Sequence, residues 1–272
     1  GVTKLQLGVQ ALDEKILKKI KRGHSLEPVA TSTRLLKNSG FKICYHFMPN
    51  LPGSTPKKDI SMAAMMFEDK RFKPDYLKIY PVQVIPTTEL HTLFKAGKFK
   101  TYTDKSLKNV LKSIKEITPP WVRIDRLVRD ISRQWVSSGT LKTNIRQIIQ
   151  QELKEEGKTC QCIRCREIKD GLYSQSPKLK EIIIDTLGAK EHFLSFEDKG
   201  NLYSLLRLRL PDKDQQVLFP ELEGAAIIRE VHTFGSALAL KERQSAEAQH
   251  KGLGKKLVSK AEKISKEKGF KL

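Results

Sequence analysis

The feature that most constrains the fold is a regular alternation of strand-like and helical sequence through the first half of the chain. Such alternation is typical of a parallel sheet, which can be barrel-like or doubly wound. In these sheets the loops at the carboxyl ends of the strands carry the chemistry. Strands are predicted over residues 5–10, 41–49, 76–84 and 121–131, and helices over residues 13–22, 26–40, 56–69, 87–97, 106–118 and 144–157.

The second half differs, because strand-like runs follow one another before a final helix. In the run LYSLLRLRL, alternation places Leu202, Leu206, Leu208 and Leu210 on one face and Tyr203, Arg207 and Arg209 on the other. This change in character predicts a domain break within residues 157–176. Strands are predicted over residues 179–187, 191–198, 202–210 and 225–234.

Charge composition narrows the class of partner. Lysine and arginine number 51 against 31 aspartates and glutamates, which gives a net charge of +20. This surplus favours a polyanionic partner such as nucleic acid, and the alternative is a soluble surface coated with lysine. No apolar run is long enough to cross a bilayer and no leader opens the chain, so we expect a cytoplasmic protein with no membrane partner.

The segment QHKGLGKKL predicts an anion site at the start of the final helix. Glycines let backbone amides approach an anion closely, and the free N–H groups of a first helical turn favour phosphate. The spacing matches the Q/R-x-x-G-x-G/A pyrophosphate loop of GCN5-related N-acetyltransferases. The alternative is a surface helix that starts at a glycine. The residues expected to bind acetyl-CoA are Gln249, His250, Lys251, Gly252, Leu253 and Gly254.

The strand before this loop, IIREVHTFG, is expected to hold the pantetheine arm of the same ligand. Its exposed backbone can pair with the pantetheine amides as an added strand does. Glu230 and His232 alternate to one face, and either can act as a general base, although a buried, hydrogen-bonded His232 is the simpler interpretation. The residues expected to contact acetyl-CoA are Glu230, Val231, His232 and Thr233. No catalytic residue is assigned from the sequence.

Three of the four cysteines, Cys160, Cys162 and Cys165, fall within six residues. Thiolates at this spacing can reach one ion through a tight turn, and zinc is the expected metal. The fourth ligand is left open between a histidine, Cys44, another residue and water. The spacing matches poorly the CxxxCxxC type of iron–sulfur motif, and the alternative is three unrelated reduced thiols.

Further segments lie in order along nearly the whole chain: GVTKLQLGVQ, RGH, GFKICYHFMPNLPGS, FEDKRFKPDYLKIYP, PPWVRIDRLVRDI, NIRQ, CQCIRCREI, FLSFED and LLRLRLP. With the two acetyl-CoA segments, they resemble the catalytic subunit of Elongator in its archaeal or bacterial single-chain form. The resemblance implies an α/β fold with three parts. These are a partial TIM-like radical-SAM barrel over residues 1–156, a zinc-binding linker over residues 157–176 and a mixed α/β GNAT acetyltransferase domain over residues 177–272.

The resemblance also implies an activity, the carboxymethylation of wobble uridine in tRNA by radical chemistry. Acetyl-CoA supplies the added group, and S-adenosylmethionine with a 4Fe–4S cluster supplies the radical. Gln10 and the loop of residues 48–53 are expected to face S-adenosylmethionine. Candidates for phosphate contact are Arg123, Arg126, Arg129 and Lys142, with solvated surface or internal salt bridges as an equal alternative.

Two departures from the family are expected. Its iron–sulfur cysteines lie before the position of Gly1, so the cluster ligands are expected to be absent from this chain, and both ends look truncated. Two other functions stay open on the sequence. One is a conventional protein or histone lysine acetyltransferase, which the glycine loop alone permits, and the other is a non-catalytic tRNA-binding scaffold. The oligomeric state is left open, and a homo-oligomer is one option.

Overall fold

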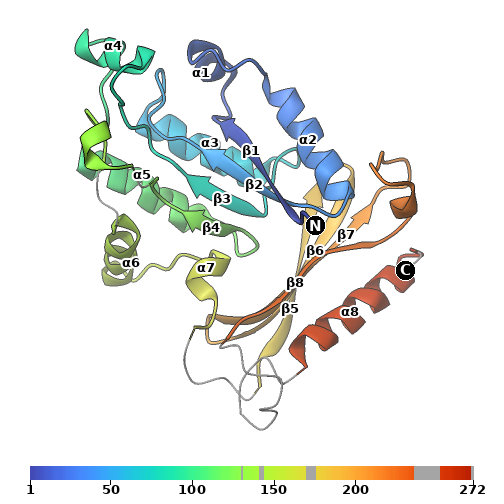
Figure 1. Cartoon of the computed structure of the whole chain (residues 1–272). Coiled ribbons are helices and arrows are strands. Elements are labelled where there is room, and N and C mark those ends of the chain that lie inside the picture. The colour runs from blue at the N-terminus through green and yellow to red at the C-terminus, as the bar shows by residue number, and fades with distance from the viewer. Residues whose placement is uncertain (130, 141–143, 170–175, 236–251, 271–272) are drawn as a thin grey trace. The chain divides into compact units, whose positions relative to one another are not determined.

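A computed structural model describes residues 1–129, 131–140, 144–169, 176–235 and 252–270 (Figure 1). The predicted strands and helices are present, with shorter strands at residues 76–84 and 121–131. None of the described helices is both long and apolar enough to cross a membrane. The elements are β1 (Lys4–Gln10), α1 (Glu14–Lys19), α2 (Leu26–Asn38), β2 (Lys42–Phe47), α3 (Pro56–Glu68), β3 (Tyr76–Ile79), α4 (Glu89–Lys95), α5 (Asp104–Ile117), β4 (Arg123–Arg126), α6 (Ile145–Glu155), α7 (Ile163–Arg166), β5 (Lys178–Thr186), β6 (Ala189–Asp198), β7 (Asn201–Pro211), β8 (Ile227–Thr233) and α8 (Leu253–Glu267).

The chain divides into two compact units. The parallel unit comprises Gln6–Ala30 and Cys44–Cys162, and the antiparallel unit comprises Gly1–Leu5, Thr31–Ile43 and Ile163–Leu272. The division therefore passes through β1, α2 and β2. The division of the chain into residues 1–156, 157–176 and 177–272, which the resemblance implies, stays a prediction.

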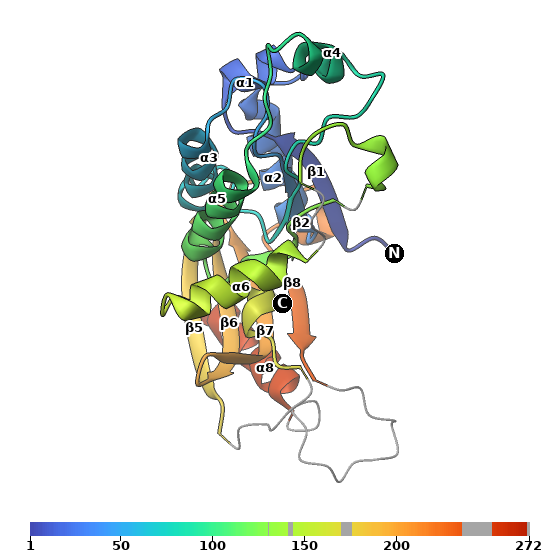
Figure 2. The same cartoon turned by 90° about the vertical axis from the view of Figure 1, so that its left-hand side faces the viewer.

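The parallel unit is built on a sheet of order β1-β2-β3-β4, in which β2 pairs parallel to β3 and β3 parallel to β4. The predicted parallel α/β sheet is thus confirmed. One face is apolar, since Phe47, Leu77 and Ile79 are fully buried. Helices α3 and α5 pack against each other on one side of the sheet (Figure 2). Thr55 caps α3, because its side chain accepts the Lys58 N–H at 3.2 Å.

The antiparallel unit is a four-stranded sheet of order β5-β6-β7-β8 with α8 packed against it. A register shift opposite Phe196 and Glu197 leaves Tyr203 as an extra residue in β7. Tyr203 consequently lies in the same cluster as Leu206 and Leu208, so its predicted placement on the opposite face is wrong. Leu202 is buried but pairs with Glu197 and is not part of that cluster, so its predicted placement with the other leucines is wrong as well. The apolar cluster beneath α8 consists of Leu194, Phe196, Tyr203, Leu206, Leu208, Leu210, Leu253, Leu257, Ala261 and Ile264.

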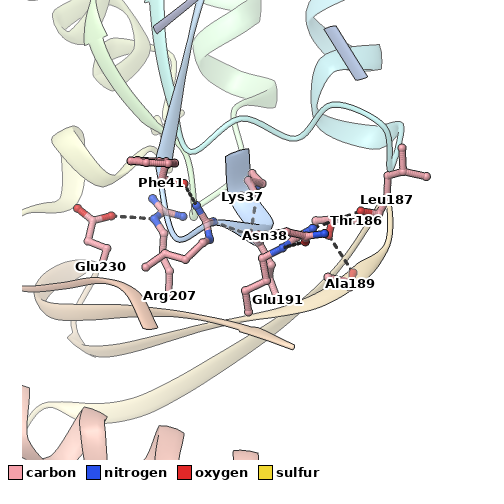
Figure 3. A network of polar contacts seen from close by, with 11 residues as sticks. Lys37, Asn38, Phe41, Thr186, Leu187, Ala189, Glu191, Arg207 and Glu230 are labelled. Atoms are coloured by element: carbon pink, nitrogen blue, oxygen red, sulfur yellow. Dashed lines mark hydrogen bonds and ion pairs between the residues drawn. The ribbon is translucent and has the colours of Figure 1, made fainter. Parts of the chain in front are cut away.

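The other face of this sheet carries buried charge (Figure 3). Glu191 of β6 accepts hydrogen bonds from Arg209 Nη1 at 2.8 Å, Arg229 Nη2 at 2.9 Å and Lys37 Nζ at 3.3 Å. Arg209 Nε also donates to Asn38 Oδ1 at 2.7 Å, and Arg229 Nη1 donates to the Phe41 carbonyl at 2.9 Å. The network therefore fixes the C-terminal part of α2 to β7 and β8.

Replacing Glu191 with glutamine tests how much this network contributes to the free energy of unfolding. The substitution keeps the side-chain shape but leaves three buried cations around a neutral group, and breaking a buried pair in this way costs about 3–5 kcal/mol. We expect urea unfolding to report a loss of that size. Glu267→Gln on the exposed surface of α8, where Glu267 lies 3.8 Å from Lys263, is the matched control and should change stability by less than about 0.5 kcal/mol. Equal effects of the two substitutions would contradict the assigned role.

Candidate functional site

The carboxyl edge of the parallel sheet brings together two segments singled out by sequence. Gln10 ends β1 with a φ of 64°, and its carbonyl accepts the Met48 N–H at 2.8 Å. Gln10 thus lies beside the loop of residues 48–53 that follows β2. The Gln10 Oε1 atom is buried and has no hydrogen-bond partner among the described residues. A buried acceptor held in an uncommon backbone conformation is typical of a functional position.

The loop after β2 is held by a fully buried carboxylate. Asp59, in the first turn of α3, accepts the Asn50 N–H at 2.8 Å, the Ser54 hydroxyl at 2.5 Å and the Tyr102 hydroxyl at 2.8 Å. Asn50 has a φ of 69° and accepts the Tyr102 N–H through Oδ1 at 2.7 Å. The four residues therefore close the loop onto α3 and onto the segment before α5.

Burial governs the ionisation of this cluster. Burial raises the pKa of Asp59 above its usual value, against the opposing effect of the three hydrogen bonds. The pKa of Tyr102 is also raised, first by burial and then by the Asp59 charge. Tyr102 therefore stays a hydrogen-bond donor at neutral pH, and its hydroxyl stabilises the charged form of Asp59.

The start of α8 carries the backbone geometry that the glycine motif predicts. Gly252 caps the helix in the left-handed conformation with a φ of 66°, and no side chain of the described residues caps the first turn. A Cβ atom on Gly254 would lie 3.5 Å from Thr233 Oγ1 and 3.9 Å from Val231 Cγ1. The structure thus places the helix start against β8. Gln249, His250 and Lys251 lie outside the described residues.

Strand β8 is an edge of its sheet and carries a register shift opposite Arg207 and Leu208. Glu230 pairs with Arg207 across the strands, and the Arg207 Nε–Glu230 Oε2 distance is 2.8 Å. Glu230 is therefore committed to an ion pair. His232 is exposed, with its ring 4.3 Å from that of Phe234, so the interpretation of His232 as buried is wrong.

The cysteine segment is compact. The sulfur atoms of Cys160, Cys162 and Cys165 all lie within 4.8 Å of one another. Four tetrahedral thiolates bound to zinc at about 2.3 Å have sulfurs about 3.8 Å apart, so a small closure of this triad would accommodate the ion. Cys160 and Cys162 are buried. Cys44 is not part of this group.

An ion pair beside Cys165 anchors α7 to the antiparallel sheet. Arg166 Nη1 donates to Glu197 Oε1 at 2.6 Å, and Ser195 and Lys180 donate to the same carboxylate. Burial alone would raise the pKa of Glu197, but these hydrogen bonds and the Arg166 charge outweigh it and lower the pKa. Glu197 is therefore ionised at neutral pH, and the turn that holds Cys165 is fixed.

The basic residues proposed for phosphate contact differ in their surroundings. Arg123 lies 3.2 Å from Asp125 in an ion pair, so the salt-bridge alternative holds for it. Arg126 and Arg129 are exposed, and Lys142 lies outside the described residues.

Sequence reasoning missed the polar side chains Gln6, His46 and Lys78, which lie on strands β1, β2 and β3, and the Asp59–Tyr102 contact. The signal for His46 is a polar residue inside the otherwise apolar run KICYHF. The signal for Asp59 is an acidic residue in the first turn of a helix that follows a Pro-Gly loop. Neither signal identifies the partner residue.

Comparison with family descriptions and known proteins gives consistent results. Residues 1–65 match the radical SAM superfamily, and residues 74–155 match the radical SAM C-terminal domain. A tRNA uridine(34) acetyltransferase of Dehalococcoides mccartyi is 42% identical over 98% of this chain and 59% of its own length. Elongator complex protein 3 of Homo sapiens is 36% identical over 98% of this chain and 50% of its own length.

A solved structure has the same fold. The archaeal Methanocaldococcus infernus Elp3 with an N-terminal deletion superposes with a TM-score of 0.89 at 38% identity, over 98% of this chain and 65% of that one. The resemblance drawn from the sequence is confirmed. The chain spans about half to three fifths of the length of the two relatives above.

Tyr102→Phe tests the closure of the loop by Asp59. The substitution removes one donor from a buried carboxylate, and a hydrogen bond to a charged group is worth about 1.5–3 kcal/mol. We expect a loss of that size in urea unfolding at neutral pH. Because the lost bond favours the ionised form, the loss should shrink as pH falls through the raised pKa of Asp59 toward the ordinary aspartate value.

The matched control is Tyr80→Phe, since the Tyr80 hydroxyl makes no hydrogen bond to a described residue in the parallel unit. This variant should show a smaller loss without that pH dependence. A Tyr102→Phe loss that is the same at neutral and acidic pH would contradict the assigned coupling.

Proposed function

Because this chain is a homologue of the tRNA uridine(34) acetyltransferases and of Elongator complex protein 3, we propose that it takes part in acetyl-CoA-dependent modification of wobble uridine in tRNA. The observation that carries the proposal is homology along 98% of the chain together with a pyrophosphate-type helix start beside an edge strand. The parallel unit provides the radical-SAM part and the antiparallel unit the acetyltransferase part.

For acetyl-CoA, the residues present fit the group. Gly252 begins α8, and because the first turn of a helix has no intrahelical partners for its backbone N–H groups, a pyrophosphate there would gain from both hydrogen bonds and the helix dipole. Val231 and Thr233 border this helix start. Strand β8 lies at the edge of its sheet and would offer backbone groups to the pantetheine amides. We retain Glu230, Val231, His232 and Thr233 as the strand contacts, with Glu230 acting through its backbone.

For S-adenosylmethionine, we propose that Gln10 and the loop of residues 48–53 provide contacts, because the buried Gln10 Oε1 is an acceptor next to that loop. The radical SAM superfamily implies a 4Fe–4S cluster for this chemistry. The cysteines of this chain do not fit such a cluster. Cys44 is fully buried within β2, and the other three belong to the triad at residues 160–165. No step is derived through the cluster.

For zinc, we propose Cys160, Cys162 and Cys165 as ligands, because three soft thiolates converge within a short distance. Residues 157–176 would then act as a zinc-binding linker. Metal analysis of purified protein should find stoichiometric zinc that is lost in a Cys162→Ser variant. Unchanged zinc content in that variant would overturn this assignment.

The acetyl-CoA site is tested by two glycines at opposite ends of α8. Gly252 and Gly269 both have positive φ, 66° and 77°, and an added Cβ meets no atom within 4 Å at either. Alanine therefore introduces similar backbone strain at both positions. We expect Gly252→Ala to weaken CoA binding in calorimetry by about tenfold, which corresponds to about 1.4 kcal/mol, and Gly269→Ala to leave it unchanged. Equal weakening would assign the effect to helix stability and contradict the site.

The substrate is tested by acetyl-CoA turnover. We expect the 272-residue chain to hydrolyse acetyl-CoA faster with tRNA than without it, and a lysine-rich peptide to give no stimulation. Transfer of acetyl groups to the peptide with no effect of tRNA would instead support a protein lysine acetyltransferase. Binding of tRNA with no effect on acetyl-CoA would support a non-catalytic scaffold.

A further inference from the structure

The parallel sheet has two unlike faces. Parallel sheets are usually covered on both sides, and their strands then read as continuous apolar sequence. Here the positions that alternate with the buried apolar residues include Gln6, His46 and Lys78, which are exposed or half-buried. These three side chains are called the polar row below. All three belong to the parallel unit.

Hydrogen bonds organise the polar row across three strands. His46 of β2 and Lys78 of β3 are register partners, so their side chains share a face. Gln6 Oε1 of β1 lies 2.6 Å from His46 Nε2 and 2.7 Å from Lys78 Nζ. The ring of Tyr80 contacts the His46 ring edge-on, with centroids 5.3 Å apart. The row is therefore an ordered surface and not a set of independent solvated side chains.

The contacts determine which atoms donate. A lysine ammonium can only donate, so the Gln6 atom that it contacts must be the carbonyl oxygen. The same oxygen then accepts from His46, which requires the proton of the ring on Nε2. Burial first, and then the charges of Lys78 and Arg129, lower the pKa of His46. The imidazole is consequently neutral, and its Nδ1 is an acceptor.

The free hydrogen-bonding capacity of the row follows from this assignment. The Gln6 amide nitrogen and the remaining Lys78 hydrogens are donors, and His46 Nδ1 is an acceptor. One edge of uracil carries the opposite set, two carbonyl oxygens that accept and an N3–H that donates. Cytosine places an acceptor at N3, which would face the His46 acceptor. The row therefore complements uracil better than cytosine.

Positive charge borders the row on the side of β1. A Cβ on Gly8 would lie 2.6 Å from Arg22 Nη2, so a larger residue there would displace the end of the Arg22 side chain. Arg22 donates through Nη2 to the Gly8 carbonyl at 2.8 Å and through Nε to His24 Nε2 at 3.0 Å. The RGH segment thus holds a guanidinium over β1, where a nucleotide phosphate can pair with it.

We propose that Gln6, His46 and Lys78 form the binding site for the uracil ring of the target nucleotide, and that Arg22 beside it binds the nucleotide's phosphate. The proposal rests on the proposed function, because it takes RNA as the substrate. It adds the residues that distinguish uridine from other nucleotides.

The test compares short anticodon stem-loop RNAs that differ at the wobble position and carry uridine, cytidine or an abasic nucleotide. Fluorescence anisotropy measures their binding to the 272-residue chain. We expect the uridine RNA to bind about tenfold more tightly than the other two, since a site built of matched polar groups rejects a ligand that leaves them unpaired.

Two variants isolate the row. His46→Phe keeps an aromatic ring against Tyr80 but removes both ring nitrogens, and Gln6→Glu keeps the acceptor for Lys78 but removes the amide donors. Both should bind the three RNAs equally, with affinity near that of the native chain for abasic RNA. The control, His91→Phe on α4, should retain full preference for uridine. Thermal unfolding of each variant verifies that it is folded, and either substitution suffices if the other does not fold.

The outcomes distinguish failure of the uracil-binding proposal from failure of the proposed tRNA function. If the native chain binds all three RNAs equally, the proposed uracil-binding site is wrong and tRNA binding still holds. Uridine preference that survives both substitutions also overturns the proposed site. If the chain binds none of the RNAs, both the proposed tRNA function and the proposed uracil-binding site are wrong.

Discussion

The structure of the parallel unit depends on the alternation of side chains across its sheet. Apolar residues such as Phe47, Leu77 and Ile79 are fully buried on one face, where α3 and α5 pack. The same alternation sends Gln6, His46 and Lys78 to the other face. A one-residue slip in any of these strands would exchange the two faces, so the hydrophobic pattern fixes the polar surface as firmly as it fixes the core.

The antiparallel unit differs, because both faces of its central strands β6 and β7 are buried. Leucines beneath α8 form one core, and the opposite face pairs Glu191 with Lys37, Arg209 and Arg229. This network reaches β8 one residue before Glu230. Because β8 also borders the start of α8 through Val231 and Thr233, the buried charges hold in place the strand that we assign to acetyl-CoA.

Local signals predicted most elements and much of the candidate site. The helix predicted over residues 56–69 is α3, and Gly252 marked the start of α8. What the sequence did not predict depends on partners far apart in the chain. The Tyr203 bulge is set by the opposing strand, the Lys37–Glu191 bond joins residues 154 positions apart, and the Gln6–Lys78 bond spans 72. Hydrophobic period identifies a buried face, but register decides which polar groups meet.

Photo-crosslinking tests the central claim most directly, namely that the polar face of the parallel sheet receives the target base. An anticodon stem-loop RNA with 4-thiouridine at the wobble position would be irradiated with the protein, and the crosslinked peptides identified by mass spectrometry. The account predicts crosslinks to the peptides that contain Gln6, His46 or Lys78. Crosslinks confined to α5, α6 and the antiparallel unit would contradict it.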